Sequence, residues 1–288
     1  MMNRHTLLII VALSLSISGC NFPLAADQAP EVTLPPILVI TSTPDFPPPT
    51  PILPTEIDLE FIQLNAPGPQ SRVGSPLIVS GFSLPTFEQN LVITITDANG
   101  ALLALQPATI QAELGSAGPF ESSLIFTVTE EQPGRVSVYY ASPRDGGLVH
   151  LSSAMVTLVP GSDTLIQPAP SQDEEIQIGT PDALAVISGG TLEFSGSSVY
   201  FFEANLVVAL CGAGGSGAPD PVCGTQDNLL ALTTVIIDSP DMGQPGTFVG
   251  TISYAVSQET PARLAIYAAS PMDGGLEHLS SVEVVLLP

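Results

Sequence analysis

Two stretches of the 288-residue chain repeat one another, and this repeat constrains the fold more than any other feature. The block Ser142–Ser153 returns as Ser270–Ser281, with Ser-Pro-x-Asp-Gly-Gly-Leu-x-His-Leu-Ser-Ser in both places. Earlier in each copy, Phe87–Leu91 returns as Phe202–Leu206. Most of the difference in spacing comes from one insertion around residues 211–228. Blocks that return in the same order indicate two copies of one structural unit.

Each copy has the sequence pattern of β-strands. In residues 91–96 Leu91, Ile93 and Ile95 alternate with more polar neighbours, and residues 135–140 follow the same pattern. A period of two with many β-branched side chains predicts half-buried strands. The segment Asp97–Gly100 lies between two such runs and predicts a hairpin turn. About seven short strands in roughly 100 residues predict a sandwich of two sheets.

The first 56 residues predict export and anchoring rather than a fold. Residues 1–20 have the pattern of a signal peptide, whose apolar run Thr6–Ile17 is too short to cross a bilayer. Ile17-Ser18-Gly19-Cys20 matches a lipobox, so we expect Cys20 to be lipidated; an ordinary signal peptide with an incidental cysteine is the alternative. Residues 21–56 are rich in proline and predict an extended stalk. The expected location is therefore extracytoplasmic, lipid-anchored to the bacterial membrane at the cell surface or periplasmic face.

The charge of the chain argues against a nucleic-acid partner. It has 28 acidic residues, five arginines and no lysine, for a net charge of −23. Such a surface repels the phosphates of nucleic acids and of anionic lipids. We expect the membrane to be contacted through the lipid anchor and the remaining partner to be an envelope protein or a glycan.

The repeated blocks resemble a known family. Ser75–Gly81, Phe87–Leu91, Asp97–Gly100, Gly118–Phe120 and Ser142–Gly147 occur in the order typical of the immunoglobulin-like domain family named for bacterial spore-germination proteins. The resemblance covers about residues 57–159 and, more loosely, 174–287. It implies an extracytoplasmic sandwich, often part of a lipoprotein, with no known catalysis.

The expected fold class is therefore all-β, with two tandem immunoglobulin-like β-sandwiches after a Pro-rich stalk. The expected domains are a signal peptide at 1–20, a stalk at 21–56, sandwich 1 at 57–159, a linker at 160–174 and sandwich 2 at 175–288.

Cys211 and Cys223 predict a disulfide in the insertion of the second copy. With Cys20 acylated they are the only remaining thiols, and thiols outside the cytoplasm pair. A metal site or reactive thiols are the alternatives. The loop that they close lies at a sheet end, where it could bind a partner or be an idle insertion.

No catalytic, cofactor or metal site is expected from the remaining polar residues. His150 and His278 occupy equivalent positions in different domains, whereas a catalytic triad needs partners that converge in one copy. Zinc needs about four ligands, and the mature chain has only two histidines. Asp145 and Asp273, with Asp97, could serve calcium, but no loop has its ligand spacing. Asp-Gly-Gly is typical of a tight turn, which explains both Asp-containing blocks better than catalysis.

Arg135 and Arg263 recur at matching places, as do Glu88 and Glu203. The hypothesis is a charge pair or strand-edge contact within each domain, and the alternative is a shared ligand-binding surface.

The sequence thus predicts a non-enzymatic binding or adhesion module at the cell envelope, with a protein or cell-wall glycan as partner. Two alternatives stay open: a structural spacer or assembly component of an envelope complex, and a spore-germination-related envelope protein.

Overall fold

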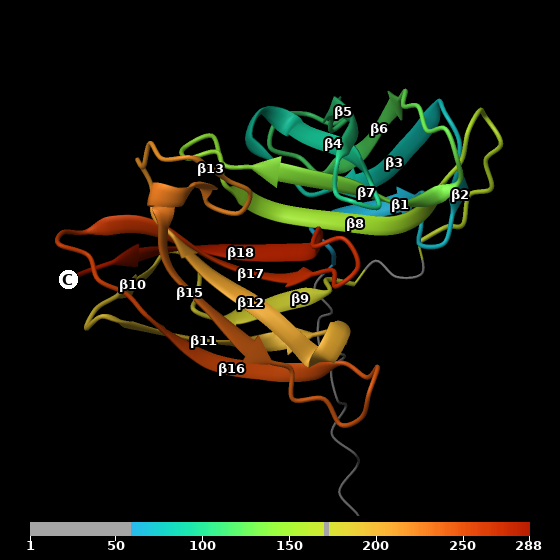
Figure 1. Ribbon diagram of the computed structural model, residues 1–288. Coiled ribbons are helices and arrows are strands. Elements are labelled where there is room, and N and C mark those ends of the chain that lie inside the picture. Colours follow the sequence, from blue (N-terminus) through green and yellow to red (C-terminus); the bar gives the residue numbers. More distant parts are fainter. Residues whose placement is uncertain (1–58, 170–172) are drawn as a thin grey trace, which may run out of the picture. The chain divides into compact units, whose positions relative to one another are not determined.

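The computed structural model describes residues 59–169 and 173–288, which belong to one compact unit, Leu53–Pro288. The predicted signal peptide, the lipidation site Cys20 and the Pro-rich stalk up to residue 58 lie outside these residues. None of the described helices is long and apolar enough to cross a membrane. Strands dominate the described chain, which confirms the all-β prediction (Figure 1).

The first sandwich has a three-stranded sheet, β1-β3-β6, packed against a four-stranded sheet, β5-β4-β7-β8. In β4 the apolar residues Leu91, Ile93 and Ile95 point into the core, as their alternation predicts. The short strand β2 adds to β8 in parallel. The strands are β1 (Ile62–Ala66), β2 (Arg72–Val73), β3 (Leu77–Ser83), β4 (Asn90–Asp97), β5 (Leu102–Thr109), β6 (Gly118–Leu124), β7 (Gln132–Ala141) and β8 (Leu148–Leu158).

The second sandwich has the same strand order. The sheet β9-β11-β16 packs against β15-β12-β17-β18, and β10 adds to β18 in parallel. A two-stranded ribbon, β13-β14, lies in the insertion. The strands are β9 (Ile176–Thr180), β10 (Ala185–Ile187), β11 (Thr191–Ser198), β12 (Asn205–Cys211), β13 (Pro219–Asp220), β14 (Gly224–Thr225), β15 (Leu229–Ile236), β16 (Gly246–Ser253), β17 (Thr260–Ala269) and β18 (Leu276–Leu286).

The two four-stranded sheets join into one. The last strands of the two copies, β8 and β18, run side by side and pair antiparallel, with Leu151 opposite Leu279 (Figure 1). These two leucines are equivalent in the repeat, and the next pair along the strands is His278 opposite Ser152. An interface in which equivalent residues meet is isologous, the type found in two-fold symmetric dimers. A pseudo-two-fold axis therefore passes near this leucine pair.

Burial at the junction differs from the prediction of half-buried strands. Five consecutive residues are buried in β7, Gly134–Val138, and five in β17, Ala262–Ile266. One face of each strand points into its own sandwich, and the other is covered at the junction. Side chains from both copies form a third apolar cluster there, consisting of Leu148, Leu151, Ala209, Cys211, Val222, Cys223, Ala265 and Leu279.

The predicted linker is partly ordered against the first sandwich. Arg72 in β2 and Leu165 exchange both of their backbone hydrogen bonds, at 2.9 and 2.7 Å. Ser71 Oγ also accepts a hydrogen bond from the Gln167 N–H. The segment up to residue 169 is therefore held on the first sandwich, and the chain enters the second one at Asp173–Glu175.

Candidate functional site

Two reciprocal ion pairs cross the junction. Arg263 of β17 contacts Asp145 of the first copy at 3.0 Å, and Arg135 of β7 contacts Asp273 of the second copy at 3.0 Å. All four side chains are at least 97 % buried. The hypothesis of a charge pair within each domain is therefore wrong, because each arginine reaches the turn of the other copy. Glu88 and Glu203 lie exposed in short 3-10 turns of their own sandwiches instead.

In each turn a glycine leaves space for the arginine of the other copy, and an aspartate carries the charge that pairs with it. A Cβ atom at Gly147 would collide with the Arg263 guanidinium, and one at Gly275 would lie 3.1 Å from Arg135 Nε. Burial would raise the pKa of Asp145, but the Arg263 guanidinium and the Gly147 N–H outweigh it and hold the pKa below its usual value. The pKa of Asp273 is lowered in the same way, against burial, by Arg135 and Ser270.

The turn interpretation of the aspartates is confirmed. Asp145 Oδ1 accepts a hydrogen bond from the Gly147 N–H at 2.9 Å, and Asp273 Oδ1 accepts one from Gly275 at 3.1 Å. Asp97 Oδ1 accepts from the N–H groups of Asn99 and Ala101 in its own hairpin. Each carboxylate is thus committed to its turn, and two of them also bind an arginine.

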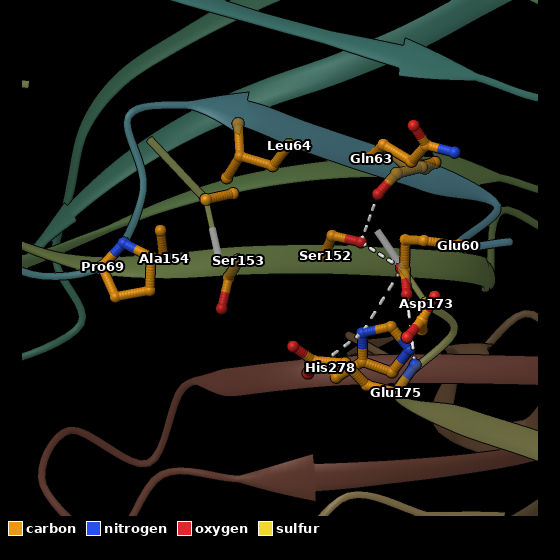
Figure 2. A pocket seen from close by; sticks show the side chains of 12 residues that line it. Glu60, Gln63, Leu64, Pro69, Ser152, Ser153, Ala154, Asp173, Glu175 and His278 are labelled. Carbon is orange, nitrogen blue, oxygen red and sulfur yellow. Dashed lines mark hydrogen bonds and ion pairs between the residues drawn. The ribbon is translucent and has the colours of Figure 1, made fainter. Parts of the chain in front are cut away.

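A buried polar cluster lies beside the pseudo-two-fold axis. It consists of Glu60, His150, Glu174 and His278, which we call the junction cluster. His150 projects from β8 and His278 from β18, and the glutamates stand two residues before β1 and β9. Each residue thus has an equivalent in the other copy. Figure 2 shows Glu60 and Ser152 of the first copy facing His278 of the second.

Each histidine of the junction cluster lies close to both glutamates. His150 Nε2 lies 3.3 Å from Glu60 Oε1 and 3.2 Å from Glu174 Oε2. His278 Nε2 lies 2.8 Å from Glu174 Oε1, and its Nδ1 lies 3.6 Å from Glu60 Oε1. The two imidazole rings meet edge to face, with centroids 5.1 Å apart.

Two serines orient the carboxylates of the junction cluster. Ser152 Oγ donates to Glu60 Oε1 at 2.5 Å, and the equivalent Ser280 Oγ lies 2.6 Å from Glu174 Oε1. The carboxylates therefore have fixed positions before anything binds.

Burial and mutual contacts shift the pKa values of equivalent residues in the junction cluster in opposite directions. Burial raises the pKa of Glu60 to about 8, partly offset by His278. Burial would also raise the pKa of Glu174, but its hydrogen bonds with both histidines lower it well below the usual value. Burial lowers the pKa of His150, whereas Glu60 and Glu174 overcome burial and raise that of His278 to about 9. The cluster thus holds protons that balance its carboxylates.

The junction cluster is absent from the sequence predictions, because each histidine was assigned to a separate domain. The structure brings four possible metal ligands together, with one ligand atom from each within 4.8 Å of the others. Zinc was not expected, because residues 21–288 have only two histidines. A usable signal was present: Glu60 and Glu174 precede equivalent strands at the same distance.

The insertion in the second copy covers the junction. Cys211 and Cys223 form the predicted disulfide, with Cα atoms 5.2 Å apart. Asp220 Oδ1 accepts from the N–H groups of Val222 and Cys223, and the Val222 carbonyl accepts from Leu148 N–H of the first copy at 2.9 Å. The loop therefore packs on the first sandwich.

Three hollows lie along the junction. A groove of about 400 Å³ runs between the Gly100 hairpin and the disulfide loop, and its lining includes Thr94, Ser137, Tyr139, Leu151 and Pro221. A hollow of about 350 Å³ reaches His150 and Glu174, and a cavity of about 80 Å³ reaches Glu60 and His278. The junction cluster is thus approached from both sides.

The match to a known family supports the fold of the first copy. Residues 61–147 match the family described as the immunoglobulin-like domain of bacterial spore germination. No curated protein matches the chain. A solved structure of dimeric latent PorU from Porphyromonas gingivalis aligns with 12% identity over 79% of this chain and 24% of that one, at a TM-score of 0.22. The extracellular domains 3–5 of Drosophila OTK align with 10% identity over 80% of this chain and 67% of that one, at a TM-score of 0.19.

The chain spans about a quarter of the PorU chain that it aligns with. The family match indicates an extracytoplasmic or germination-related module.

Proposed function

We propose, from the match of residues 61–147 to the spore-germination immunoglobulin-like family, that this chain is a non-enzymatic, lipid-anchored envelope protein that binds a partner with two fixed sandwiches. In this proposal residues 175–288 are a second copy of the same domain, and Cys20 holds the protein outside the cytoplasm. The observation that carries it is the junction: a shared sheet and two buried ion pairs hold both copies in one body. Such a body presents a surface that neither copy has alone.

The groove at the junction is the surface best suited to a ligand. Hydroxyl groups of Thr94, Thr96 and Ser137 lie along it, next to the ring of Tyr139 and the side chains of Leu102 and Leu151. Ligand sites combine apolar walls with a few fixed polar groups in this way. A glycan or peptide segment fits these groups, and the net charge of −23 disfavours an acidic ligand.

Capture from envelope extract tests this binding role. Full-length protein in detergent should retain a protein or glycan that the Tyr139→Ala variant loses, because the variant removes the aromatic wall of the groove. Ile78→Ser is a matched control, since Ile78 is 56 % exposed on β3 and does not line the groove. Equal capture by wild type and Tyr139→Ala would reject the groove, and repeated recovery of nothing would favour the spacer.

The anchor is tested separately. Cys20→Ser should move the protein from the membrane fraction to the soluble extracytoplasmic fraction, because no acyl chain can then be attached. Retention of the variant in the membrane fraction would contradict lipid anchoring through Cys20.

A germination-related role is the second candidate, and the family match favours it. Deletion of the gene in the source organism should then delay germination, measured by the loss of spore refractility. Unchanged germination would leave the general envelope role.

A further inference from the structure

We propose that the junction cluster is a structural zinc site, in which Glu60, His150, Glu174 and His278 each supply one ligand. This inference does not depend on any partner of the groove. Its first support is geometric. One ligand atom from each of the four residues lies within 4.8 Å of the others.

The separations suit a small tetrahedral ion. Zinc holds nitrogen and oxygen ligands at about 2.0–2.2 Å, which places neighbouring ligand atoms roughly 3.3–3.6 Å apart. His150 Nε2 lies 3.3 Å from Glu60 Oε1 and 3.2 Å from Glu174 Oε2. His278 Nε2, the nitrogen that would bind the ion, lies 2.8 Å from Glu174 Oε1, while its Nδ1 faces Glu60 Oε1 at 3.6 Å. Because the ligand atoms lie up to 4.8 Å apart, shifts of about an ångström would complete the tetrahedron.

A divalent cation could take the place of the protons that balance the carboxylates of the site. Each arginine in the described residues is paired elsewhere: Arg72 with Glu131, Arg135 with Asp273, Arg144 with Glu283, and Arg263 with Asp145. The chain has no lysine. Two carboxylates, two neutral imidazoles and one divalent ion sum to zero charge, which removes the cost of burying unpaired charge.

The donor set selects the class of ion. Two imidazole nitrogens and two carboxylate oxygens suit zinc and similar transition metals, whereas calcium and magnesium prefer oxygen ligands alone. Four protein ligands leave no open position, which is the pattern of structural rather than catalytic zinc. The site therefore supports a mechanical role at the junction.

Surrounding groups and access complete the site. Ser152 and Ser280 contact the carboxylates at 2.5 and 2.6 Å, as outer partners of metal ligands do. Glu175 Oε2 lies 3.7 Å from His278 Nδ1 and could orient that ring. The hollow of about 350 Å³ beside His150 and Glu174 provides an entry path.

The experiment uses full-length protein in detergent, stripped with EDTA and titrated with zinc chloride. The disulfide is kept intact, so Cys211 and Cys223 do not compete for the metal. We expect saturable binding of one ion per chain and a rise in Tm that EDTA reverses, because the ion binds only the folded junction. Cobalt in place of zinc should give the visible absorption of a tetrahedral site.

Variants assign the ligands. His278→Gln should weaken zinc binding more than about 100-fold, since losing an outer partner alone costs roughly 10–100-fold. Glu193→Gln is the control, because it makes a carboxylate-to-amide change on an exposed position of β11. Glu174→Gln should behave like His278→Gln and unlike Glu193→Gln.

A measurement on the wild type avoids any folding defect of the variants. The chain has three histidines, so their ring proton resonances are readily assigned by NMR. Zinc should shift the resonances of His150 and His278 together and at one equivalent. Zinc that leaves both unshifted, or full-affinity binding by His278→Gln, would overturn the proposal.

Discussion

The hairpins β4–β5 and β12–β15 occupy the same place in the two sandwiches but differ in what they contact. The first closes with Asp97–Gly100, and Asp97 satisfies two backbone N–H groups of its own turn. The second carries the insertion with the disulfide, and its Val222 accepts a hydrogen bond from the first copy. The contrast teaches that the junction combines symmetric contacts, present in both copies, with one asymmetric cover built by a single insertion.

The largest expected effect comes from breaking the symmetric contacts. Arg263→Ala should lower the free energy of unfolding by about 3–5 kcal/mol, because Asp145 loses its buried cation and keeps only the partly exposed Arg144. Arg135→Ala, its equivalent, should cost a similar amount. Urea denaturation measures both, and Arg72→Ala, on a 38 % exposed side chain, should cost far less because solvent screens this pair. Costs as small as that for both buried arginines would show that the junction does not depend on these pairs.

Removing the asymmetric cover should come next. Cys211→Ala with Cys223→Ala should cost about 3 kcal/mol, because an open loop gains entropy in the unfolded chain. Hydrogen exchange at the Leu148 N–H should accelerate as well, since its acceptor Val222 lies in this loop. Unchanged exchange at Leu148 would mean that the loop holds its place without the disulfide.

Acid should weaken the symmetric contacts by a smaller amount. The folded pKa of Asp145 lies below its ordinary value of 3.8, so its contribution is complete above that pH and is lost as the pH falls through the folded pKa. Asp145→Asn should cost about 1–3 kcal/mol at pH 7. This difference from wild type should shrink below about pH 4, measured by urea denaturation across pH. A difference that is independent of pH would contradict the ion pair.

The smallest effect is expected at the short hairpin. Asp97→Ala removes the acceptor of two exposed backbone hydrogen bonds and should cost about 1 kcal/mol. Because both hydrogen bonds of Asp97 lie within this turn, exchange at the Leu148 N–H should stay as in wild type. Faster exchange there would show that the two hairpins are coupled through the groove.

Much of the fold could be predicted from local pattern. The alternation in 91–96, the Asp97–Gly100 turn and the pairing of Cys211 with Cys223 depend on neighbours in sequence, and each is present in the structure. The strand ends that become the junction were not predictable in this way. Burial of both faces of β7 depends on a contact with the other copy, which no periodicity records.

The candidate site could be predicted only in part. The recurrence of Arg135 as Arg263 was visible, but a repeat shows which positions are equivalent and not which copy supplies the partner. His150 and His278 were likewise judged one domain at a time. Around a two-fold axis equivalent residues meet one another, so polar residues that recur in both copies were the signal to combine.

The pairing of β8 with β18 also has a consequence for assembly. In a single sandwich, β8 would leave part of its backbone N–H and C=O groups unpaired, and such an edge recruits another strand. The interface is of the kind that identical subunits form, and here one chain supplies both halves. Covalent connection raises the effective concentration of the second half, so association no longer depends on protein abundance. A protein held sparsely in an envelope would thus keep its dimer-like form at any copy number.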